Sequence, residues 1–203
     1  MSLPATASAL LDLWFEGATV TAVGSASERW YRKDDAFDAM LRERFGEALE
    51  VALRGELGSW CATPLGSLAF VTLCDQIARN VYRGTARSFA FDPLALHASR
   101  SARARQEDAS LTIPQRVFLA MPLMHSESLA IHDEAAMVFA AIVEHAERDV
   151  PTLVPYAKNV LDYERKHRAI LDRFGRYPHR NAIVGRTSTA DEISFLQTPG
   201  SSF

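Results

Sequence analysis

The spacing of apolar residues constrains the fold of this chain more than any other feature of its sequence. Apolar side chains return every three or four positions over most of the chain, whereas the alternating pattern of a half-buried strand is almost absent. Between residues 37 and 52, for example, this spacing follows Asp34 and Asp35, either of which can cap a helix. The sequence therefore predicts an all-α protein.

Prolines and glycines mark where these helices are expected to begin and end. Proline suits the first turn of a helix because its missing N–H would have no partner there, and glycine suits the position just beyond the last turn. The predicted starts are Pro64, Asp92, Pro114 and Pro151, the predicted ends include Gly84 and Gly175, and Pro122 is predicted to interrupt the segment before it.

Two more helices are predicted from polar residues at their N-termini. Ser126, followed by Glu127, can cap a long helix that runs to about His145, because an acid suits the positive end of the helix dipole. The stretch Thr189–Glu192 has the form of a capping box before a final helix. We therefore predict seven to nine helices, packed as antiparallel hairpins in a single helical domain that spans residues 1–203.

Composition and charge are those of an ordinary globular domain. The 203 residues are 48% hydrophobic and 23% charged, enough to bury a core without a disulfide or a metal. A net charge of −3 argues against a dedicated nucleic-acid binder, which usually carries a strong basic excess. There are two cysteines, no apolar run of roughly 18 residues and no secretion-type N-terminus. We expect a soluble, cytoplasmic protein that neither spans nor binds a membrane.

The helix after Pro151 carries two ionisable residues in the middle of its apolar face. Positions from Leu153 to Phe174, taken in alternating steps of four and three, share one side of the helix, and Glu164 and His167 fall on that side. His167 is therefore predicted to point inward. Either it is a neutral core histidine with a hydrogen-bond acceptor, or it belongs to a functional site.

The helix that begins at Pro64 shows the inverse pattern. It is apolar nearly all round, so we expect it to be central, yet a polar strip follows one side of it. Asp75 and Arg79 stand at i and i+4 in the order that favours an ion pair. Burying each charge costs several kcal/mol, roughly, so the pair either joins helices together or faces a wet pocket. The strip consists of Thr72, Asp75, Gln76, Arg79 and Arg83.

The segment His125-Ser126-Glu127 precedes a long apolar helix. The N-terminus of a helix offers unpaired N–H donors and partial positive charge, which makes it a natural anion site. His132 lies seven residues beyond His125, so both can share one face. The alternative is a capping segment with one exposed histidine.

The segment after Gly175 is rich in hydrogen-bond donors. Residues 165–186 contain seven lysines and arginines and one acid, Asp172. We expect a local basic surface that attracts phosphate, carboxylate or an acidic peptide, although basic residues at the end of a helix also complement its dipole. The donors of this loop are Arg176, His179, Arg180 and Asn181.

Motifs of known chemistry are mostly missing. The chain contains no nucleophile elbow, phosphate-binding loop or dinucleotide fingerprint. Glu164-x-x-His167 is half of a di-iron bundle motif, but no second Glu-x-x-His is present. We therefore predict no metal site, and the sequence implies no cofactor.

Five ordered segments carry a resemblance to a known family: Asp75–Asn80, Arg83–Ala86, Pro122–Glu127, Phe174–Asn181 and Gly185–Thr189. They look like the bacterial domain-of-unknown-function 924 family, and the similarity extends from Trp14 to Leu196. The resemblance implies an all-α fold of the tetratricopeptide-like class of helical hairpins, and it implies no activity. The chain departs from the family at Ile77-Ala78, where Phe-Pro is usual.

Three hypotheses for function follow. The first is an interior polar pocket for a small anion, a phosphate or a carboxylate, with His125 or His167 as the catalytic, proton-transferring group. The second is a tetratricopeptide-like scaffold that grips an acidic peptide, whose terminal carboxylate the basic loop takes. The third is a buried network that only fixes helix packing. The predicted ligand-binding residues are Asp75, Arg79, Arg83, Glu127, Glu164, Arg176, His179, Arg180 and Asn181.

Overall fold

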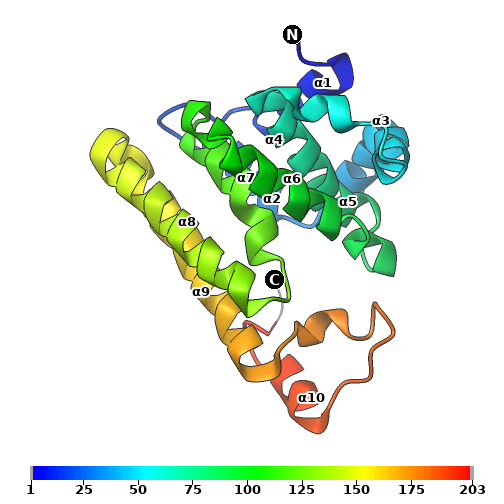
Figure 1. Ribbon diagram of the computed structural model, residues 1–203. Helices are drawn as coiled ribbons and strands as arrows, with labels where there is room; N and C mark the ends of the chain where they lie inside the picture. Colours follow the sequence, from blue (N-terminus) through cyan, green and yellow to red (C-terminus); the bar gives the residue numbers. More distant parts are fainter. Residues whose placement is uncertain (1, 202–203) are drawn as a thin grey trace.

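Every regular element in the computed structural model is a helix (Figure 1). The structure describes residues 2–201, and Met1, Ser202 and Phe203 lie outside the described residues. Within that range there are nine helices when α4, α5 and the π turn between them are counted as one continuous helix. The all-α fold and the predicted number of helices are confirmed.

One continuous helix runs through the centre of the N-terminal half. Its first part is α4 (Pro64–Thr72), a π turn follows at Leu73–Ile77, and α5 (Ala78–Val81) completes it. Every residue from Gly66 to Ala78 is buried, so the prediction of a central helix that begins at Pro64 is confirmed. Around it lie α1 (Ala5–Trp14), α2 (Ala26–Tyr31), α3 (Asp35–Leu53), α6 (Asp92–Ala104) and α7 (Ile113–Met124).

Aromatic rings fill the core beneath these helices. Phe118 of α7 is fully buried, and its ring meets Trp14 of α1 edge-on at 5.7 Å and Trp30 of α2 at 4.7 Å between centroids. Such edge-to-face pairs stabilise a core beyond their buried area. Short 3-10 turns connect the larger helices at Gly58–Ala62, Ala86–Phe89 and Glu107–Ser110.

A long helical hairpin extends from this bundle. It consists of α8 (Leu129–Asp149) and α9 (Val154–Phe174), which lie side by side in Figure 1 and are joined by a 3-10 turn at Pro151–Leu153. Gly175 ends α9 in the left-handed conformation at φ 67°, which glycine adopts without strain. Gly175 is confirmed as the end of this helix, whereas Pro151 begins the 3-10 turn and α9 itself begins three residues later, at Val154.

The remaining chain folds back against the end of the hairpin. It contains a 3-10 turn at Pro178–Arg180 and α10 (Ala190–Leu196), and Figure 1 shows both beyond the end of α9. The capping box predicted at Thr189 and Glu192 is confirmed, with the Glu192 N–H 3.2 Å from the Thr189 hydroxyl.

Two predicted boundaries were wrong. Pro122 does not interrupt α7, which continues through it to Met124, although the missing N–H of Pro122 leaves the Phe118 carbonyl without its helical donor. The long helix that follows does not begin at Ser126: its N-cap is Ser128, and it continues past His145 to Asp149. Glu127 therefore lies in the connecting turn, where it binds residues far along the chain.

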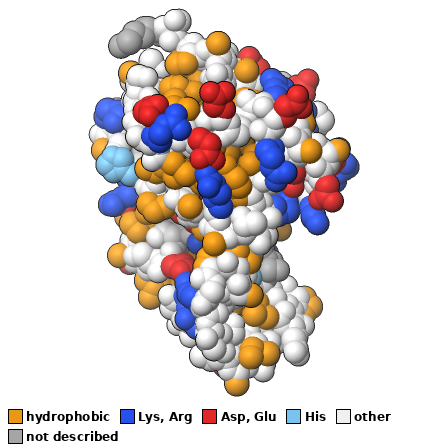
Figure 2. Space-filling model, turned by 90° about the vertical axis from the view of Figure 1, so that its right-hand side faces the viewer, with side chains coloured by type: hydrophobic (Ala, Val, Ile, Leu, Met, Phe, Trp, Pro, Cys, Tyr) orange, Lys and Arg blue, Asp and Glu red, His pale blue; other side chains and the backbone are white. Residues whose placement is uncertain are grey.

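No helix among residues 2–201 is long and apolar enough to cross a membrane. On the face drawn in Figure 2, basic and acidic side chains stand next to one another and form no patch of one sign.

Candidate functional site

The π turn between α4 and α5 places a carboxylate in the middle of the protein. Asp75 is fully buried, and its Oδ1 lies 2.7 Å from His125 Nδ1, while its Oδ2 accepts from Gln76 Nε2 at 2.5 Å. Burial alone would raise the pKa of Asp75, but His125 and Arg79 lower it to about 2. Asp75 is therefore ionised at neutral pH. Single π turns inside α-helices occur frequently at functional sites.

The ionised Asp75 determines which nitrogen of His125 carries a proton. A carboxylate only accepts, so His125 Nδ1 donates the hydrogen bond and Nε2 is the nitrogen that can take up or release a proton. His125 is the C-cap of α7, and its side chain is 17% exposed. An imidazole oriented in this way by a carboxylate is suited to act as a general base.

Two guanidinium groups stand beside this pair. Arg79 donates to Asp92 Oδ1 at 2.8 Å, and Arg180 reaches Asp92 Oδ2 at 3.3 Å, so one carboxylate bridges both. Arg180 also donates to the carbonyl of His125 at 2.9 Å. Burial and the neighbouring charge of Arg79 lower the pKa of Arg180. We call Asp75, Arg79, Asp92, His125 and Arg180 the outer cluster.

A second group, the inner cluster, is fully buried and consists of His132, Glu164 and Tyr177. His132 Nδ1 lies 2.7 Å from Glu164 Oε1, and His132 Nε2 lies 3.0 Å from the carbonyl of Ser126. A carbonyl only accepts, so Nε2 carries a hydrogen. The hydroxyl of Tyr177 also lies 3.0 Å from this Nε2. Tyr177 donates to the carbonyl of Met124 at 2.7 Å. The other carboxylate oxygen, Glu164 Oε2, is buried and has no hydrogen-bond partner among the described residues.

His167 lies between the two clusters. Its ring centroid is 6.2 Å from that of His125 and 5.7 Å from that of Tyr177. Its Nδ1 is 2.8 Å from the carbonyl of Tyr163, and burial together with the charge of His125 lowers its pKa to about 3. The predicted inward orientation of His167 is confirmed, and the ring is neutral at pH 7.

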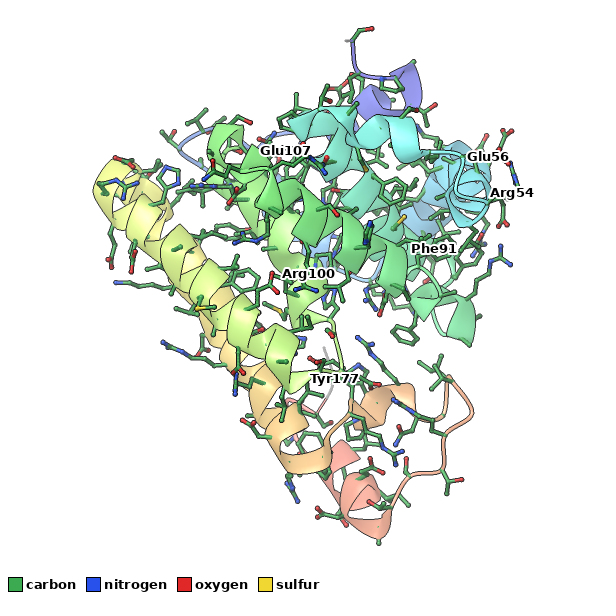
Figure 3. The ribbon with its side chains drawn as sticks, viewed as in Figure 1. Arg54, Glu56, Phe91, Arg100, Glu107 and Tyr177 are labelled. Atoms are coloured by element: carbon green, nitrogen blue, oxygen red, sulfur yellow. The ribbon has the colours of Figure 1, made fainter. Side chains whose placement is uncertain are left out.

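His179 flanks Tyr177 on another side. The two rings stack with centroids 5.5 Å apart, and burial, followed by the charge of Arg180, lowers the pKa of His179 to about 4. Figure 3 shows Tyr177 where the α8–α9 hairpin, the end of α7 and the C-terminal segment meet. Tyr177 is thus the ring around which three histidines and Arg180 are arranged.

Five predicted ligand residues lie outside both clusters: His179, which flanks Tyr177, and Arg83, Glu127, Arg176 and Asn181. Arg83 pairs with Asp38 of α3 at 2.7 Å, and Arg176 pairs with Glu192 at 2.7 Å. Asn181 donates to the Ser188 hydroxyl at 3.1 Å. Each of these contacts joins neighbouring segments of the fold, so these side chains already serve as structural ties.

Glu127 is also a tie. It accepts from the backbone N–H of Tyr177 at 2.7 Å and forms an ion pair with Arg186 at 2.6 Å. The prediction of a basic surface over residues 165–186 needs correction. Acidic residues from other parts of the chain form ion pairs with its arginines and neutralise their charge. The pairs are Arg168–Asp133, Arg173–Asp191, Arg176–Glu192, Arg180–Asp92 and Arg186–Glu127.

The side chains of both clusters are packed against one another. Two hollows stand out among the described residues, one along α6 and one between α2 and the start of α3, and no residue of either cluster lines them. Within residues 2–201, no three His, Cys, Asp or Glu side chains are placed to hold a metal ion together. An anion at the outer cluster would therefore have to displace a side chain.

Reasoning from the sequence missed three important residues. Asp92 was read only as the start of a helix, His132 was weighed as an exposed histidine, and Tyr177 was seen only as part of a donor-rich loop. His132 was also expected to share a helix face with His125, but the turn at residues 125–128 places them on different helices.

Comparison with known proteins adds the family. A model of a bacterial protein family of unknown function, DUF924, matches residues 10–200. The chain belongs to the DUF924 family. The structure of a protein of unknown function, ATU0120, from Agrobacterium tumefaciens is similar to this DUF924 chain, with a TM-score of 0.79 and 33% sequence identity. The similarity covers 95% of this chain and 97% of that one. A search of curated proteins found no match to this chain.

Proposed function

We propose that this DUF924 protein binds a small oxyanion, a carboxylate or a phosphate, at the outer cluster. Arg79 and Arg180 would hold the anion, and Nε2 of His125 would exchange a proton with it. The observation that carries the proposal is the bridge at Asp92, where one carboxylate already spans the two guanidinium groups. Arginine forks bind planar oxyanions more specifically than lysine does.

In this proposal Asp92 is an internal stand-in for the ligand. Its side chain is 20% exposed and belongs to the first residue of α6, so it can move without disturbing the core. Phe89 packs against both guanidinium groups. The centroid of its ring lies 5.3 Å from the guanidinium carbon of Arg79 and 4.6 Å from that of Arg180. Because the Asp92 carboxylate already lies between the two guanidinium groups, an external anion would have to displace it.

His125 is the better of the two predicted proton-transferring residues. Its Nδ1 is held by Asp75, and its side chain reaches the surface beside Arg79. His167 is more deeply buried and hard to protonate, so we propose that it packs behind the reacting nitrogen.

The first prediction is that Asp92→Asn increases affinity for small oxyanions. Asparagine keeps the size of the side chain but removes the charge that competes for both arginines. We expect acetate and inorganic phosphate to bind the variant at least ten-fold more tightly than the wild type in calorimetric titrations. Arg180→Gln should bind neither. Arg83→Gln is the matched control, since Arg83 pairs with Asp38 away from the outer cluster, and it should behave as the wild type. Equal, unsaturable heats for Asp92→Asn and Arg180→Gln would refute the proposal.

The remaining hypotheses rest on other observations. A tetratricopeptide-like arrangement of the hairpins stays a proposal, and a peptide at the basic loop would have to displace the carboxylates that pair with Arg176 and Arg186. A structural role is supported for the inner cluster, which is fully buried and joins α8 to α9 through His132 and Glu164.

A further inference from the structure

A groove lies between α6 and α8, separate from the outer cluster. It is an open hollow of about 750 Å³. Its lining is Pro93, Leu96, His97, Arg100, Ser101, Arg103 and Ala104 from α6 and Glu134 from α8. Figure 3 shows Arg100 in the space between these helices.

The groove is long enough for a helix. The lining runs from Pro93 to Ala104, roughly 16 Å at 1.5 Å per residue, which corresponds to about three helical turns. Leu96 and Ala104 supply apolar surface on α6. On α8, Met137 is 69% exposed and follows Glu134 by three positions, so it lies on the same side of that helix. An amphipathic helix can bury its apolar face along such a groove.

The charge of the lining is basic. Arg100 pairs with Glu134 at 3.0 Å; the Arg100 side chain is exposed and that of Glu134 is half-buried, so the pair contributes little and Arg100 can exchange partners at small cost. Arg103 lies 3.5 Å from Asp108, and burial lowers its pKa. Two guanidinium groups thus face one carboxylate of the lining, in a chain whose net charge is −3. A ligand here gains from negative charge.

We propose that this groove binds an acidic amphipathic helix of a partner protein, about three turns long. Its apolar residues would pack on Leu96, Ala104 and Met137, and its carboxylates would bind Arg100 and Arg103. The proposal is independent of the oxyanion site, because no residue of the outer cluster lines the groove.

Two model peptides of about 14 residues test the proposal. Both carry leucine at helical spacing, with glutamate at the other positions of one and lysine at those of the other, and fluorescence anisotropy measures their binding. We expect the glutamate peptide to bind saturably and the lysine peptide not to bind. Arg100→Glu should weaken the glutamate peptide at least ten-fold. Arg54→Glu is the matched control, because Arg54 lies on the opposite side of the molecule from α8 in Figure 3, and it should bind as the wild type does.

Ala104→Trp provides a second test that leaves the charge unchanged. Ala104 is exposed, so the fold tolerates the larger side chain, which fills part of the groove. We expect this variant to melt like the wild type and to lose the glutamate peptide. Failure of the glutamate peptide to bind the wild type, or binding that survives both Arg100→Glu and Ala104→Trp, would overturn the proposal. Equal binding of a single-stranded oligonucleotide would also overturn it, because the groove would then recognise negative charge alone.

Discussion

Three histidines in this protein each have Nδ1 committed to a specific acceptor. The acceptors are the Asp75 carboxylate for His125, the Glu164 carboxyl for His132 and the Tyr163 carbonyl for His167. Only the first of these rings combines a charged partner with access to solvent. The three histidines therefore have two different roles. His125 is suited to proton exchange, and His132 and His167 are suited to packing.

The acid stability of the protein should depend on His167. Its pKa of about 3 in the folded state lies below the ordinary value of 6.5, so the unfolded chain binds the extra proton first. Stability is therefore complete above about pH 6.5 and falls as the pH decreases towards 3. His167→Asn keeps an N–H for the Tyr163 carbonyl and removes the titration. Between pH 7 and pH 4 we expect the free energy of unfolding, measured with urea, to fall by on the order of a few kcal/mol more in the wild type than in this variant. Parallel stability curves would contradict the assignment.

The buried pair of His132 and Glu164 should behave as a unit. Removing one partner leaves the other buried without compensation, which costs about 3–5 kcal/mol, whereas replacing both with apolar residues is often neutral. We predict that Glu164→Leu and His132→Leu are each strongly destabilising and that the double variant recovers most of the loss. Denaturant unfolding of the four proteins measures the coupling, and additive losses would show that the pair is not coupled.

At the scale of single residues, periodicity was enough to find Glu164 and His167. The 3.6-residue repeat assigns a side of the helix to every position, and both residues fall among apolar neighbours on the buried side. Their surroundings could not be predicted in the same way, because His132 and Tyr177 approach from the neighbouring helix and the C-terminal segment.

At the scale of helices, several starts were predictable, the start of α8 was placed two residues too early, and local irregularities were not predictable. Pro64 and Asp34 carry direct signals, since each acts on the backbone of its own first turn. The π turn at Leu73–Ile77 has no such signal, although it positions Asp75. Its position depends on how the surrounding helices pack, and a single sequence does not reveal that.

The start of α4 also depends on a close approach of two backbones. A Cβ atom at Gly66 would lie 1.8 Å from the carbonyl oxygen of Trp60, a clash that flexible side chains cannot relieve. We predict that Gly66→Ala destabilises the protein by several kcal/mol, roughly the scale of other backbone clashes in packed cores.

Gly46→Ala is the matched control for this substitution. Gly46 lies inside α3, and its nearest neighbour would be the flexible Arg42 side chain at 3.9 Å. Alanine there should stabilise the helix by about 0.5–1 kcal/mol. Thermal melting compares the two variants. Equal melting temperatures would show that the close approach of Gly66 to the Trp60 carbonyl does not matter for stability.

At the scale of the molecule, the outer cluster brings together segments far apart in the sequence. Asp75 comes from the π turn, Asp92 from α6, His125 from the end of α7 and Arg180 from the segment after α9. The ties at Glu127 and Arg176 hold that last segment in place. The residue types were visible in the sequence, but their convergence depends on helix packing, and the neutralising acids are up to 88 positions away.

The most direct test of the central proposal is the ¹⁵N spectrum of the histidine rings during a titration with acetate, recorded for the wild type and Asp92→Asn at pH 7. If the outer cluster binds oxyanions, the His125 signals will move and saturate, at lower acetate concentration in the variant. The signals of His97 and His145, which lie outside both clusters, will stay in place. No saturable change at His125 in either protein, or the same small change at all six histidines, would contradict the proposal.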